Sequence, residues 1–113
     1  MRNKLWIALG GSTLDEYEVR MSDRAFRDLD GIYAYIAKTL QEPAIALSLV
    51  NDLETAILSL DAMPHRCPQR SVGAYANRGY RQLFVKNYTV LFRVIEKAKQ
   101  VVIITIKYSS SAF

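Results

Sequence analysis

Two helix-forming segments separated by only two residues constrain the fold of this chain more than any other feature. The first begins after Ser22 and the second at Pro43, with Gln41-Glu42 between them. Each repeats apolar residues at three-to-four spacing, which is typical of a helix with one buried face. The stripes are Phe26, Leu29, Tyr33, Ile36 and Leu40 in the first segment, and Ala46, Leu49, Val50, Leu53, Ile57 and Leu60 in the second. So short a link makes the pair an antiparallel hairpin, whose stripes need a further apolar surface to cover them.

Residues at the boundaries of both helices support this reading. Ser22 is a preferred N-cap residue, and Asp23 follows it at the positive end of the helix dipole. Pro43 suits the first turn of the second helix, which we expect to end before Pro64.

Four strand-like runs supply the missing surface. Residues 17–21 alternate apolar and polar side chains, whereas residues 80–86 and 88–95 are rich in β-branched and aromatic residues. Residues 101–106 are almost wholly apolar, as expected for a strand covered on both faces. Short connections make the last three runs antiparallel neighbours. The sequence therefore predicts an α+β domain with the order β-α-α-β-β-β.

Length and cysteine content favour one intracellular domain. With 113 residues the chain has room for a single core, and we assign residues 17–113 to it and residues 1–16 to an N-terminal extension. The apolar run from Leu5 to Leu9 is too short for a signal peptide or a membrane span. A lone Cys67 excludes an intramolecular disulfide, so we expect a reduced, cytoplasmic location without membrane contact.

The charge is divided unevenly along the chain. Before Pro64 there are six basic and ten acidic residues, a net charge of −4, whereas from Pro64 onward nine basic residues accompany only Glu96, a net charge of +8. A basic half of this kind is expected where a protein meets a polyanion such as nucleic acid, although exposed Lys and Arg also serve solubility.

Several stretches together resemble the RelE/ParE toxins of bacterial type II toxin–antitoxin modules. They are YEVRMSDRAFRDLDGIYAYI, LSLDAMP, GYRQLFVKNYTVLFRV and VVIITIKY, which span residues 17 to 108. The resemblance implies a helical hairpin packed on one face of a small twisted antiparallel sheet, with the other face as the working surface. It also implies a cognate antitoxin as partner. One branch of these toxins cuts mRNA in the ribosomal A site, and another, the ParE branch, poisons DNA gyrase.

Alternation along the strands places some basic side chains on the face that the helices leave open, where cations suit phosphates and rings suit bases. The candidates are Arg81, Arg93 and Tyr108 for catalysis, and Arg78, Lys86 and Lys107 for substrate contact. Arg81 and Lys86 have opposite parity on a regular strand, so one of them needs the turn or a bulge to reach this face. The alternative interpretation is that Arg81 and Arg93 only solvate the sheet, and that Tyr88 and Phe92 are packing residues.

RNA cleavage at such a surface needs no metal or cofactor, because the 2′-hydroxyl of the substrate is the nucleophile. Arg81 or Arg93 would stabilise the charge of the transition state, and Tyr108 or a lysine would move protons if nearby cations lowered its pKa. His65 and Cys67 lack the further ligands of a zinc site. We therefore expect a ribosome-dependent mRNA endonuclease. Two alternatives stay open: a gyrase inhibitor, which long hairpin helices favour, and a non-catalytic binding module.

Overall fold

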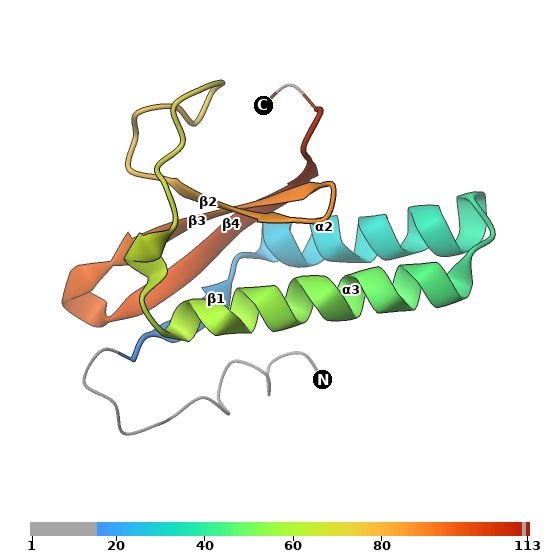
Figure 1. Ribbon diagram of the computed structural model, residues 1–113, viewed down its shortest axis with the longest axis horizontal. Coiled ribbons are helices and arrows are strands. Elements are labelled where there is room, and N and C mark those ends of the chain that lie inside the picture. Colours follow the sequence, from blue (N-terminus) through green and yellow to red (C-terminus); the bar gives the residue numbers. More distant parts are fainter. Residues whose placement is uncertain (1–15, 112) are drawn as a thin grey trace.

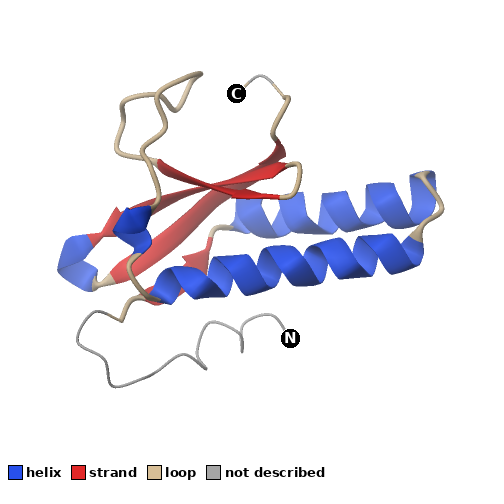
Figure 2. Cartoon of the chain, viewed as in Figure 1, coloured by secondary structure: helices blue, strands red, loops and turns tan. Residues whose placement is uncertain are grey.

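The computed structural model of the chain describes residues 16–111 and 113. Helices α2 (Asp23–Ala34) and α3 (Pro43–Leu58) form an antiparallel hairpin on one side of a four-stranded sheet (Figure 1). The loop at residues 67–80 and the C-terminal residues lie on the opposite side (Figure 2). The predicted element order and α+β class are confirmed. Below, the two sides of the sheet are termed the helix face and the far face.

The sheet is mixed rather than wholly antiparallel. Its strands are β1 (Glu18–Met21), β2 (Arg81–Val85), β3 (Tyr88–Ile95) and β4 (Gln100–Tyr108), in the spatial order β1-β4-β3-β2. The three C-terminal strands are antiparallel as predicted, but β1 runs parallel to β4. The hairpin explains this direction, because α2 and α3 return the chain to the end of the sheet where β1 starts. After the loop, β2 begins level with Met21, the last residue of β1, and runs in the direction of β1, so that two antiparallel steps later β4 is parallel to β1.

Both helices begin as predicted. The Ser22 hydroxyl accepts a hydrogen bond from the backbone N–H of Ala25 at 3.0 Å and also donates to the carbonyl of Ile104 at 2.9 Å, so one side chain caps α2 and ties it to β4. Pro43 occupies the first turn of α3. The first helix is interrupted earlier than predicted, because α2 passes at Tyr35 into a short π-helix, η1 (Tyr35–Thr39), before the link.

The core lies between the hairpin and the helix face of the sheet. Leu29 of α2 and Leu53 and Ile57 of α3 are fully buried against Phe92 and Ile103. At about 1.5–3 kcal/mol for each such side chain, this burial is the main stabilising term of the fold. Leu91 and Thr89 point to the far face and are also buried, so the centre of the sheet is covered on both sides.

Helix α3 is unusually apolar on its solvent side. Ile45 and Leu47 are more than half exposed, and the stretch Pro43–Asp61 meets the length and hydropathy of a membrane span by composition alone. Its buried side packs in the core through Val50, Leu53 and Ile57, and 22% of the apolar stretch is buried inside the structure.

Candidate functional site

Arg81 lies on the helix face of the sheet, and the prediction that it lies on the open face is wrong. Its partner across the strands is Phe92, a core residue, and Leu83 and Val85 share its parity and pack against the core. The guanidinium donates to the backbone carbonyl of Cys67 at 2.6 Å and also to that of His65. Arg81 therefore ties the loop after α3 to the first residue of β2.

Arg93 lies on the far face, on the other side of the sheet from Arg81. Its guanidinium donates to the carbonyl of Arg78 at 3.0 Å, and the guanidinium carbon lies 4.7 Å from the centre of the Tyr80 ring. This hydrogen bond brings the backbone of Arg78 next to the side chain of Arg93. The two arginines assigned to catalysis, Arg81 and Arg93, do not share a surface.

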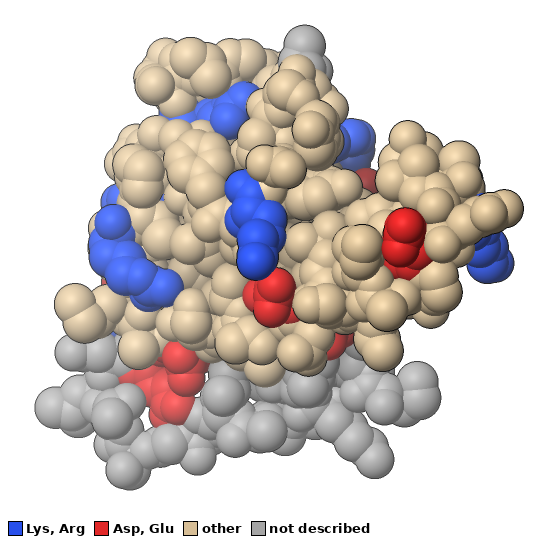
Figure 3. Space-filling view, turned by 45° about the vertical axis from the view of Figure 1, so that its right-hand side comes forward, with Lys and Arg blue, Asp and Glu red and all other residues tan. Residues whose placement is uncertain are grey.

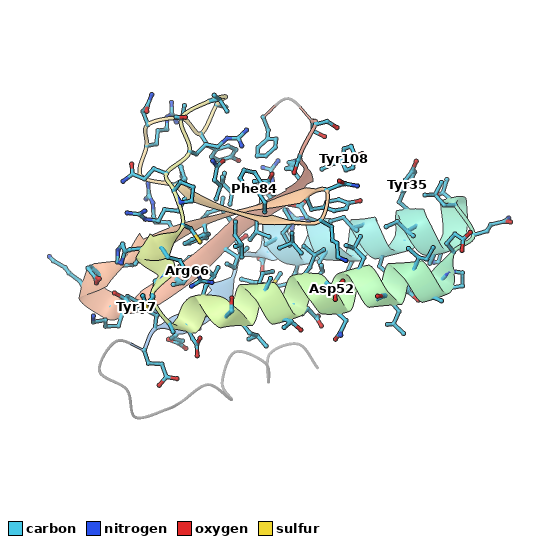
Figure 4. The ribbon with its side chains drawn as sticks, viewed as in Figure 1. Tyr17, Tyr35, Asp52, Arg66, Phe84 and Tyr108 are labelled. Atoms are coloured by element: carbon cyan, nitrogen blue, oxygen red, sulfur yellow. The ribbon has the colours of Figure 1, made fainter. Side chains whose placement is uncertain are left out.

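Lys86 and Tyr108 occupy a third location, at the end of the sheet above the hairpin. The Lys86 ammonium lies 3.7 Å from a carboxylate oxygen of Asp52 on α3. Tyr108 is paired with Tyr88, and their rings meet edge to face with centroids 5.5 Å apart. Lys107 precedes Tyr108 on β4, so it lies on the opposite face of the strand, where it pairs with Thr89 of β3. Figure 4 shows Tyr35 rising from the hairpin toward the end of the sheet where Tyr108 lies.

These residues border a groove of about 960 Å³ between the hairpin and the end of the sheet. Its lining combines apolar and aromatic side chains with a few charges: Ile32, Tyr35, Ile36, Leu40, Ile45, Leu49, Tyr88, Ile106 and Tyr108, with Arg27, Asp28, Asp52, Lys86 and Lys107. On the side of the molecule drawn in Figure 3, uncharged surface predominates, and the charged side chains form small separate groups. The sequence predicted a groove at the hairpin but assigned Lys86, Lys107 and Tyr108 to a substrate surface rather than to its lining. Ile45, which lies off the buried stripe of its helix, was a further signal for the groove.

Tyr88 and Cys67 are poor candidates for catalytic residues. Burial raises the pKa of Tyr88, and the neighbouring Tyr108 and Tyr35 raise it further, so Tyr88 holds its proton at neutral pH. Burial likewise raises the pKa of the Cys67 thiol, although Arg66 and Arg81 partly oppose this effect. A buried thiol of raised pKa is unreactive. Within residues 16–111 and 113, no three His, Cys, Asp or Glu side chains gather as a metal site.

A helical hairpin packed on one face of a four-stranded sheet is the fold of the RelE/ParE class of toxins, as the sequence resemblance implied. The model of the ParE toxin of the parDE type II toxin–antitoxin system matches residues 19–113, and the chain belongs to this family.

Solved structures of toxin–antitoxin proteins share the fold. The chromosomal ParDE system of P. aeruginosa is 24% identical with a TM-score of 0.69, covering 83% of this chain and 97% of that one. The RelBE2 complex of Mycobacterium tuberculosis is 22% identical with a TM-score of 0.59, covering 89% and 100%. A mutant of E. coli RelE in the free state is 10% identical with a TM-score of 0.57, covering 84% and 85%. At these identities the likeness concerns the fold alone. No curated protein sequence matches the chain.

Proposed function

We propose that this chain is a toxin that acts by binding DNA gyrase rather than by cutting RNA, and that a co-encoded antitoxin neutralises it. The observation that carries the proposal is the separation of Arg81 and Arg93 by the sheet, each with its guanidinium engaged by backbone carbonyls. Membership of the ParE family supports the choice of gyrase, since the ParE branch is the one that the resemblance links to that target.

RNA cleavage makes a geometric demand that this arrangement meets poorly. A base, an acid and a cation must surround one scissile phosphate within hydrogen-bond reach. Here Arg81 lies on the helix face, Arg93 on the far face, and Tyr108 at the groove. Ribosome-dependent mRNA cleavage remains the alternative prediction, and the experiment below tests it alongside gyrase inhibition.

The groove is the proposed docking site of the antitoxin. Its apolar lining suits the buried face of an amphipathic helix, and the basic residues Arg27, Lys86 and Lys107 suit acidic side chains on such a segment. Two of the similar structures are a ParDE system and a RelBE2 toxin–antitoxin complex, which supports an antitoxin as partner. Both gyrase and a co-encoded antitoxin imply action in the cytoplasm.

The test compares the two targets directly. Purified chain is added to gyrase and relaxed plasmid, and supercoiling and trapped cleaved DNA are measured. Transcripts from cells after brief induction are mapped by primer extension. We expect supercoiling to be inhibited, cleaved DNA to accumulate, and transcripts to remain whole, and the antitoxin to reverse these effects. New transcript ends at ribosome-bound codons, with gyrase unaffected, would overturn the proposal and restore the endonuclease.

Arg81→Ala serves as a further arm of this test. If Arg81 only holds the loop at Cys67, the variant loses stability, by about 1–3 kcal/mol for a hydrogen bond to a charged group, and loses toxicity only in proportion to the folded fraction. A folded Arg81→Ala protein without any activity would instead support a direct role in catalysis.

A further inference from the structure

We propose that three arginines on the far face form a binding site for the phosphate backbone of duplex DNA. The inference deepens the proposed function and rests on it in one respect, because gyrase holds the duplex that the toxin would meet. The site, termed the arginine corner, consists of Arg20, Arg78 and Arg93.

The strand register brings these residues together. Val102 of β4 pairs with Arg20 of β1 on one side and with Arg93 of β3 on the other. Directly paired residues point to the same face, so Arg20 and Arg93 flank Val102 on the far face. Arg78 joins them through its carbonyl, which accepts a hydrogen bond from the Arg93 guanidinium.

The charge of the corner is largely uncompensated. All three residues are exposed, and neither Arg78 nor Arg93 forms an ion pair with a carboxylate in the described part of the chain. Arg20 has one ion pair, with the exposed Glu18 at 3.8 Å, and an exposed pair of this kind is weak. Glu96, the only acid after Asp61, is engaged elsewhere by Tyr17. Three exposed arginines with only one weak carboxylate partner among them are complementary to a polyanion.

One member of the corner is held in place before any ligand arrives. The Tyr80 ring supports the Arg93 guanidinium at 4.7 Å, and Tyr75 packs against Tyr80 edge to face at 5.2 Å. A fixed arginine loses less side-chain entropy when it binds phosphate.

The geometry favours duplex DNA over a single strand. Arg20 and Arg93 are two strand spacings apart, about 10 Å, which lies between the widths of the minor and major grooves, about 6 Å and about 12 Å. Two arginines at this separation reach phosphates on both sides of a groove. Single strands are bound largely through bases stacked on free aromatic faces, and the Tyr80 ring is already occupied by Arg93 and Tyr75.

The test measures fluorescence anisotropy of a labelled 20-base-pair duplex with the full chain, at salt concentrations between 50 and 200 mM. The double variant Arg78→Gln/Arg93→Gln is compared with Lys38→Gln/Lys97→Gln, which removes the same charge from the hairpin tip and the β3–β4 turn. We expect the arginine variant to bind at least 10-fold more weakly and its slope of log affinity against log salt to fall by about 2, while the lysine variant changes little. Equal binding by wild type and the arginine variant, or equal losses in both variants, would overturn the inference.

Three further measurements complete the test: a single variant, an RNA competitor and a gyrase assay. Arg78→Gln alone covers the case in which loss of Arg93 disturbs the fold, because the Arg78 side chain makes no hydrogen bond, ion pair or ring contact within the described residues. Single-stranded RNA of the same sequence is a competitor, and preferential binding of that RNA contradicts the assignment to duplex DNA. Gyrase inhibition is assayed on the same preparations. If the wild-type protein binds the duplex but leaves gyrase active, only the proposed function is contradicted. If it inhibits gyrase without binding the duplex, only this inference is contradicted.

Discussion

Among single residues, Glu96 and Tyr17 form the polar contact that joins the start of the domain to the β3–β4 turn. The Tyr17 hydroxyl donates to a carboxylate oxygen of Glu96 at 2.5 Å, and the Lys99 ammonium lies 3.8 Å from the other oxygen. The hydrogen bond from Tyr17, assisted by the charge of Lys99, holds the pKa of Glu96 below its usual 4.5. The same hydrogen bond is the main reason why the pKa of Tyr17 is raised above 10.0.

A pH dependence of stability follows from these directions. A carboxyl group with a lowered pKa in the folded state stabilises the fold fully above its ordinary pKa, and this stabilisation is lost as pH falls through the lowered value. We therefore expect Glu96→Gln to unfold with a smaller acid-induced drop in its urea midpoint below pH 4.5 than wild type. Glu42→Gln, at the link between the helices, is the control. If the urea midpoint of Glu96→Gln fell below pH 4.5 as steeply as that of wild type, this assignment would be contradicted.

The placement of Arg81 was recoverable from neighbouring residues. Leu83 and Val85 are apolar and share its parity, so a strand that buries them also turns Arg81 toward the helices. The favoured role of Arg81 in catalysis obscured this signal. No comparable sequence signal placed Tyr80 beneath Arg93, because Tyr80 precedes the strand and its position depends on the loop.

Among the elements, β4 extends beyond its short neighbour β1, and helix α2 covers the part of β4 that β1 leaves unpaired. Strand β1 ends at Met21, opposite Ile103, so the rest of β4 has no strand neighbour on that side. There Asp28 of α2 accepts hydrogen bonds from the backbone N–H of Ile106 at 3.0 Å and from the Thr105 hydroxyl. The helix thereby covers an edge that would otherwise be open to pairing with another chain.

Asp28→Ala should destabilise the protein by about 2–4 kcal/mol, because it leaves a buried hydroxyl and a buried N–H without their acceptor. Urea unfolding measures the loss. Asp28→Asn, which keeps one acceptor oxygen of similar position, should lose clearly less. Equal losses in the two variants would show that the carboxylate charge, rather than the hydrogen-bond acceptor, is what matters at this edge.

At the scale of the whole molecule, the apolar hairpin tip and the arginine corner lie apart. Five of the ten large apolar side chains that are exposed among the described residues gather near the hairpin tip, at Tyr33, Tyr35, Leu40, Ile45 and Leu47, whereas the arginine corner lies on the far face of the sheet. A single small domain therefore offers two surfaces of different chemistry, one suited to a protein segment and one to a polyanion.

Two tyrosines of the hairpin provide a matched test of the groove. Tyr35 borders the groove and is 55% exposed, whereas Tyr33 is 37% exposed and does not contribute to the lining. We expect Tyr35→Asp to weaken antitoxin binding at least 10-fold, or about 1.4 kcal/mol, since it places a charge in an apolar interface. Tyr33→Asp should leave binding nearly unchanged. Titration calorimetry with the co-encoded antitoxin measures both, and equal affinities for the two variants would place the interface elsewhere.

The sequence alone determined the element order, the cap at Ser22, the start of α3 at Pro43 and the limits of β3 at residues 88 and 95, because periodicity, capping and turn preference are local properties of the chain. The tertiary structure decided which basic residues share a surface. Arg20 and Arg93 share the far face because both pair with Val102 of β4, and Arg81 donates to the Cys67 carbonyl because of the path of a loop that no local pattern predicts. Strand register and loop position arise from packing between distant segments, and for that reason a one-dimensional pattern leaves them open.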